Sequence, residues 1–76
     1  MYSNAISTKL KTLYVMKYFA ESTSEDNPAT SKDIIAHLNQ LGFRTERKAV
    51  YADIDVLKKF GMNIVKTGKG FYYKAG

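Results

Sequence analysis

The sequence predicts a small α+β domain in which three helices precede a two-stranded antiparallel β-hairpin. Three observations support this prediction. Apolar residues recur at helical spacing as far as Phe60. Helix caps and glycine stops divide that stretch into three helices, and the pattern after Gly61 is β-prone. Because 76 residues have room for a single core, we expect residues 1–76 to form one domain.

The first helix is expected to end near Glu21, before a polar turn that closes on Asn27-Pro28. Its cap would be Ser3 or Ser7. Its apolar stripe follows a 4-3-4-3 spacing through Ile6, Leu10, Leu13, Lys17 and Ala20. Tyr14, Met16 and Phe19 widen this stripe. We expect residues 1–8 to be flexible, or in part foreign to the natural chain, and we assign no function to them.

The second helix is expected over about residues 31–41. Thr30 at its start and Asp33 three residues later resemble a capping box. Gly42 lies where a left-handed residue ends a helix, and Phe43 is placed to pack back on the last turn, as in a Schellman ending.

The third helix is expected over Glu46–Phe60, with Thr45 as its cap and Gly61 as its stop. Its inward stripe would be Val50, Ile54 and Leu57. Only Arg44 separates the end of the second helix from Thr45. Two helices joined by a tight turn that contains glycine are typical of a helix-turn-helix.

Two β-prone runs, Met62–Lys66 and Phe71–Lys74, flank the basic and glycine-rich tip Thr67–Gly70. A lone hairpin is not stable, so this one must pack onto the helices through Ile64, and through Phe71 with Tyr73 or else Tyr72. Three helices followed by such a hairpin, the wing, form the layout of a winged helix-turn-helix.

The net charge of +5 is unevenly distributed along the chain. Residues 1–43 carry four basic and four acidic side chains, whereas residues 44–76 carry eight basic and three acidic ones. This asymmetry favours a polyanionic partner. The alternative is a surface charge that serves solubility alone.

Other functions lack the residues that they need. The chain has no cysteine and a single histidine, His37, so we expect no metal site and no cofactor. Asp53 and Asp55 point apart on a helix, and Asp53 is expected to pair with a neighbouring lysine or arginine. We therefore expect no catalytic residues, no enzyme and no small-molecule site. Leu10–Ala20, the longest apolar stretch, contains two lysines and is too polar to span a membrane, so a soluble, cytoplasmic protein is expected.

The third helix is the candidate for reading double-stranded DNA in the major groove, because its basic face lies away from the apolar stripe. The wing is expected to contact the backbone or the minor groove. The candidate DNA-binding residues are Arg44, Thr45, Arg47, Lys48, Tyr51 and Ala52, with Lys66, Thr67 and Lys69 on the wing. Arg47 and Lys48 are the strongest candidates, and the rotation of the helix decides which of them faces the bases.

Two other functions compete with DNA binding. The domain would serve as a winged-helix module for protein–protein contacts if the hairpin or first helix formed an interaction surface. RNA binding would need exposed aromatic residues for stacking, and we expect Tyr72 and Tyr73 to pack on the core instead.

Several segments together resemble the N-terminal winged helix-turn-helix domain of WYL-domain and DeoR-type bacterial transcriptional regulators. The resemblance covers about residues 9–74 and rests on Leu10–Phe19, Asn27–Thr30, Asp33–Ile35 with Leu38, Arg47–Ile54 with Leu57, Phe60–Gly61 and Gly68–Tyr73. It implies operator recognition, usually by a homodimer, through Arg44–Ala52 and the Gly68–Gly70 wing.

The chain departs from the family pattern in two respects. The family commonly has arginine at the position of Ala52 and often has threonine at the position of Ala49, so one expected DNA contact is missing. The resemblance also implies a C-terminal sensor domain, which these 76 residues do not include. The chain is expected to be either a natural stand-alone protein or the N-terminal domain of a longer regulator, and its end just past the last strand favours the latter.

Overall fold

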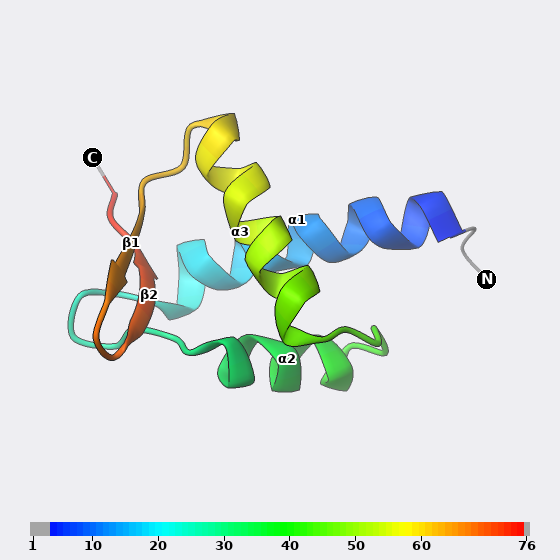
Figure 1. Cartoon of the computed structure of the whole chain (residues 1–76), viewed down its shortest axis with the longest axis horizontal. Helices are drawn as coiled ribbons and strands as arrows, with labels where there is room; N and C mark the ends of the chain where they lie inside the picture. The colour runs from blue at the N-terminus through cyan, green and yellow to red at the C-terminus, as the bar shows by residue number, and fades with distance from the viewer. Residues whose placement is uncertain (1–3, 76) are drawn as a thin grey trace.

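The computed structural model describes residues 4–75, in which three helices are followed by two strands (Figure 1). The elements are α1 (Asn4–Ser22), α2 (Ser31–Gln40), α3 (Arg47–Phe60), β1 (Ile64–Thr67) and β2 (Gly70–Tyr73). The strands pair antiparallel, with Ile64 opposite Tyr73 and Thr67 opposite Gly70. This is the α+β, winged helix-turn-helix layout that the sequence predicts.

Both ends of α2 have the predicted local structure. The Thr30 N–H donates to the Asp33 carboxylate over 2.9 Å, and the Asp33 N–H donates to the Thr30 hydroxyl over 3.2 Å, which completes the capping box. At the other end, Gly42 adopts φ +93° and the Phe43 N–H donates to the Leu38 carbonyl over 2.9 Å, as a Schellman ending requires.

The start of α3 differs from the prediction. Its cap residue is Glu46, whose side chain makes no capping hydrogen bond, rather than Thr45. Glu46 is extended, with φ −133° and ψ 170°, so the helix begins one residue later than expected. The Thr45 hydroxyl is buried and has no hydrogen-bond partner among the described residues. Thr45 therefore lies too far from the first turn, and is turned too far inward, to cap it.

The first helix begins earlier than expected, at Asn4. Residues 4–8, which we expected to be flexible, are helical, and Ser7 lies inside the helix rather than at its cap. Ser3, the other candidate cap, lies outside the described residues.

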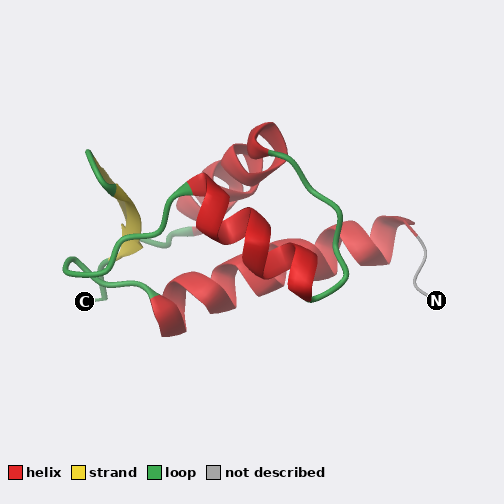
Figure 2. Cartoon of the chain, turned by 90° about the horizontal axis from the view of Figure 1, so that it is seen from below, coloured by secondary structure: helices red, strands yellow, loops and turns green. Residues whose placement is uncertain are grey.

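The core forms where the three helices and the hairpin meet, and Figure 2 shows the helices crossing over one another with the strands at one side. Its members are Val15 and Phe19 of α1, Ala29, Ile34 and Leu38 in and before α2, Val50, Ile54 and Leu57 of α3, and Ile64 and Phe71 of the hairpin. The inward stripe predicted for α3 is confirmed.

The buried face predicted for α1 is right at Phe19 and wrong at Leu13, Lys17 and Ala20. Val15 and Phe19 are completely buried, whereas Leu13 is 53% exposed and Lys17 and Ala20 are exposed as well. The helix is apolar on more than one side, and spacing alone does not say which side meets the core. Of the stripe that we expected inside, Leu13, Lys17 and Ala20 face solvent and Leu10 is half-buried, while the side chain of Ile6 is not among those described.

A buried ion pair joins α1 to α3. The Asp53 carboxylate, in a residue only 7% exposed, accepts hydrogen bonds from the Lys11 ammonium and from the Thr12 hydroxyl, the latter over 2.9 Å. The prediction that Asp53 pairs with a neighbour in the sequence is wrong, because its partner is on another helix. Asp53 thereby holds the buried side of α3 against α1.

The hairpin is held by the segment that leads into α2. Ala29 and Phe71 exchange two backbone hydrogen bonds of 2.7 and 2.8 Å, and the Tyr73 N–H donates to the Thr23 hydroxyl over 3.0 Å. Phe71 and Tyr72 are both buried, although they point to opposite faces of β2. Desolvation and the neighbouring Glu25 carboxylate raise the pKa of the Tyr72 phenol above its usual value.

Gly70 is where the wing meets this segment most closely. It adopts φ +140°, and a Cβ built there would lie 2.6 Å from the Ala29 carbonyl oxygen. We expect Gly70→Ala to destabilise the domain by about 2 kcal/mol or more, because backbone strain and a backbone clash add. Gly68→Ala, where a Cβ meets nothing within 4 Å, should change the free energy of unfolding little. Urea denaturation of both variants tests this prediction, and equal stability would contradict it.

Candidate nucleic-acid interface

The outer face of α3 is free of the core over the helix's first two turns. Val50, Asp53 and Ile54 are buried on the inner side. Arg47, Lys48 and Ala52 are exposed on the outer side, as is Tyr51 with 45% of its surface accessible. The sequence left open whether Arg47 is turned toward the core, and the structure shows that its side chain is exposed.

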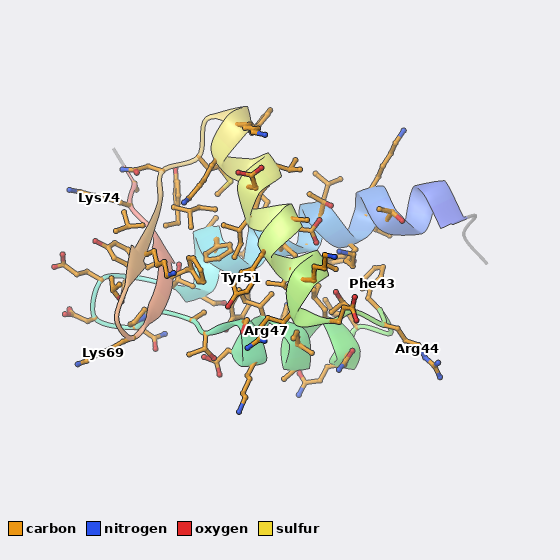
Figure 3. All side chains as sticks on the ribbon, in the orientation of Figure 1. Phe43, Arg44, Arg47, Tyr51, Lys69 and Lys74 are labelled. Carbon is orange, nitrogen blue, oxygen red and sulfur yellow. The ribbon has the colours of Figure 1, made fainter. Side chains whose placement is uncertain are left out.

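The wing lies beside this face of α3. The ring of Tyr51 packs against the ring of Phe71 in β2, with 6.0 Å between centroids. A cleft of about 320 Å³ runs between the two elements. Figure 3 shows Arg47 and Tyr51 on the side of α3 that faces the viewer, with the wing next to them. The recognition helix and the wing therefore form one surface.

This cleft contains a basic residue that is not among the DNA-binding candidates predicted from the sequence. Lys58 lines it together with Lys66 of β1, and both are exposed. Lys58 lies seven residues after Tyr51, two helical turns along the same face. That spacing is visible in the sequence, since residues i and i+7 of a helix share a face.

Lys69 and Thr67 have different positions at the wing tip, since Lys69 is exposed and the Thr67 hydroxyl is hydrogen-bonded within the turn. Lys69 is exposed, and it extends from the tip in Figure 3. The Thr67 hydroxyl donates to the Gly70 carbonyl over 3.1 Å and accepts from the Lys69 N–H over 3.0 Å. Thr67 therefore holds the turn, and its hydroxyl is already engaged within the wing.

Two candidates lie apart from the others. Arg44 is exposed, but in Figure 3 it extends at the opposite end of the molecule from Lys69. Thr45 is half-buried, with its hydroxyl turned inside. The structure thus brings together Arg47, Tyr51, Lys58 and Lys66, with Lys69 at the tip of the wing.

Most cations of this surface are unpaired. Among residues 4–75 the ion pairs are Lys11–Asp53 and the exposed Lys59–Asp55 pair, with 3.2 Å between Nζ and Oδ2. Arg47, Lys48 and the wing lysines are in neither. An unpaired surface cation keeps its full charge for a phosphate partner.

Comparison of the chain with protein-family models, with curated proteins and with solved structures finds no match. None of the helices within residues 4–75 has the length and apolar character that crossing a bilayer requires.

Proposed function

We propose that the domain binds double-stranded DNA sequence-specifically, with α3 in the major groove and the wing on the adjacent backbone or minor groove. The observation that carries the proposal is the single surface on which Arg47 and Lys48 of α3 and Lys66 and Lys69 of the wing are exposed without acidic partners. An α-helix with its side chains is about 10–12 Å wide, which matches the major groove of B-DNA.

Each part of this surface has a distinct role in the proposal. Arg47, in the first turn, is suited to a bidentate contact with guanine O6 and N7. Lys48, Lys58 and Lys66 anchor phosphates, which position the helix but carry no sequence information. The first-turn amides of α3 have no side-chain cap, so they are free to donate to a phosphate.

The biological role follows from the resemblance to WYL-domain and DeoR-type regulators. The domain would be the N-terminal part of a bacterial transcriptional regulator that acts in the cytoplasm on an operator. A full-length regulator of this kind would bind as a homodimer. The domain's own part is to dock on the duplex, which requires neither a cofactor nor catalysis.

Selection of bound fragments from random duplexes, followed by affinity measurements at two salt concentrations, tests the proposal. Four or five neutralised phosphates give a slope of log affinity against log salt of about −4, since each contributes about −0.9. A fourfold rise in salt should then weaken binding by about 250-fold. A winged helix used only for protein–protein contacts would enrich no sequence and show almost no salt dependence. The absence of an enriched sequence would refute sequence-specific recognition, and the absence of salt dependence would refute DNA binding itself.

A further inference from the structure

The face of α1 that the sequence predicted to be buried is an exposed apolar surface. Here it is called the α1 face: Leu10, Leu13, Met16, Lys17 and Ala20, with Val56 and Phe60 of α3 beside them. Phe60 is 77% exposed, and Leu13 and Val56 are each 53% exposed. Two adjoining hollows share Leu13 and Met16 and are lined almost wholly by apolar side chains. Large apolar residues gathered in this way mark an interaction surface.

The N-terminal part of α1 lies beyond the other helices. In Figure 1 the N-terminal turns of α1 extend past α2 and α3 into free space. The stripe continues along α1 with the 3-4-3 spacing of Leu10, Leu13, Lys17 and Ala20. That spacing is typical of a helix that packs lengthwise against another helix.

We propose that the α1 face binds a second copy of this chain, with the two α1 helices antiparallel across a two-fold axis. Such an interface is self-complementary, because every contact of a residue i in one copy with a residue j in the other is repeated with i and j exchanged. A second copy has the same exposed stripe, so the stripe of each α1 covers that of the other.

The charges on α1 favour this occupant. Lys9 and Glu21 are both exposed and form no ion pair within residues 4–75. They lie twelve residues apart, which is about 18 Å along the helix. Antiparallel pairing sets Lys9 of each copy against Glu21 of the other. Lys17, near the middle, can lay its aliphatic stem over the partner's Leu13 and keep its ammonium in water.

The interface would leave the DNA-binding surface open. It uses the last turns of α3, through Val56 and Phe60, and not the first turn with Arg47. All of the positive charge excess lies in residues 44–76, and the cations that define the DNA-binding surface are outside the α1 face. Two chains of charge +5 therefore meet where their repulsion is weaker. The inference stands on the apolar surface and the α1 charges, and it does not require DNA binding.

Sedimentation equilibrium of the purified chain tests the proposal. We expect a monomer–dimer equilibrium at micromolar to submillimolar concentration. Ala20→Asp should raise the dissociation constant on the order of 100-fold, because it buries an unpaired carboxylate. Ala36→Asp is the matched control, since Ala36 is an exposed alanine on α2, outside the α1 face. It should leave the constant unchanged, and circular dichroism should show both variants folded.

Charge reversal tests the antiparallel arrangement. Lys9→Glu and Glu21→Lys should each weaken the dimer, and the two together should restore it. A chain that stays monomeric at all these concentrations, or an Ala20→Asp variant that dimerises like the parent, would overturn the proposal. A double reversal no better than the singles would overturn the antiparallel pairing. Added salt screens only the Lys9–Glu21 pairs of this otherwise apolar contact, whereas it should weaken DNA binding steeply, so the two proposals fail separately.

Discussion

Replacing Arg47 and Lys48 together by alanine should lower the affinity for a selected duplex on the order of 100-fold, with the melting temperature unchanged. Both side chains are exposed, and neither is in an ion pair, so their loss removes no contact that supports the fold. A bidentate arginine–guanine contact contributes about 1–3 kcal/mol of discrimination. The loss of a phosphate contact weakens binding further and makes the slope of log affinity against log salt concentration shallower by about 1.

The matched control is Lys9→Ala with Lys17→Ala, which also removes two positive charges, but from α1. On a duplex that holds a single half-site, this control should weaken binding far less than the α3 variant. Fluorescence anisotropy measures both affinities. If the two double variants bound equally weakly, net charge alone would explain the affinity, and the assignment of α3 as the reading helix would be wrong.

Asp53→Ala should cost about 3 kcal/mol of folding stability, because it leaves the largely buried Lys11 ammonium without its partner. A domain of this size has a total stability of about 5–15 kcal/mol at most, so the variant should be largely or wholly unfolded at elevated temperature. Urea denaturation at 25 °C measures the loss.

The compensating variant separates the charge effect from general damage to the core. Lys11→Met combined with Asp53→Leu replaces the ion pair with apolar side chains, and such replacements are often neutral or stabilising. The Thr12 hydroxyl keeps an acceptor in this variant, the Thr8 carbonyl at 3.2 Å. We expect the double variant to recover most of the stability. Equal stability of parent and Asp53→Ala would show that the ion pair contributes nothing.

Local signals in the sequence were sufficient for the ends of the helices. The Thr30–Asp33 box and the Gly42–Phe43 ending involve residues close together in the sequence. Both motifs can therefore be predicted without knowledge of the rest of the chain. Thr45 is the exception. Its residue type suits a cap, but the tight turn after Gly42 directs its side chain inward.

Features set by packing between distant segments were not accessible in this way. Nothing near Asp53 in the sequence indicates that its partner is Lys11, because the pair exists only once α1 crosses α3. The prediction of which side of α1 is buried was partly wrong for the same reason. Val15 and Phe19 compete with Leu13 and Ala20 for the core, and the position of α3 decides the outcome.

The candidate interface was predicted in outline but not in its extent. Basic residues at the start of α3 and at the wing tip were recognisable from charge and order alone. That Lys58 and Lys66 face one cleft depends on the wing folding back beside α3, through the Tyr51–Phe71 contact. The sequence contains no direct signal for this contact.

Amide chemical shifts of the ¹⁵N-labelled domain, recorded as a selected duplex is added, test the central claim most directly. The account predicts the largest changes at Arg47–Ala52 and along the wing from Lys66 to Lys69, with the exposed side of α2 far less affected. Changes confined to the α1 face, or a spectrum that the duplex leaves unaltered, would contradict it.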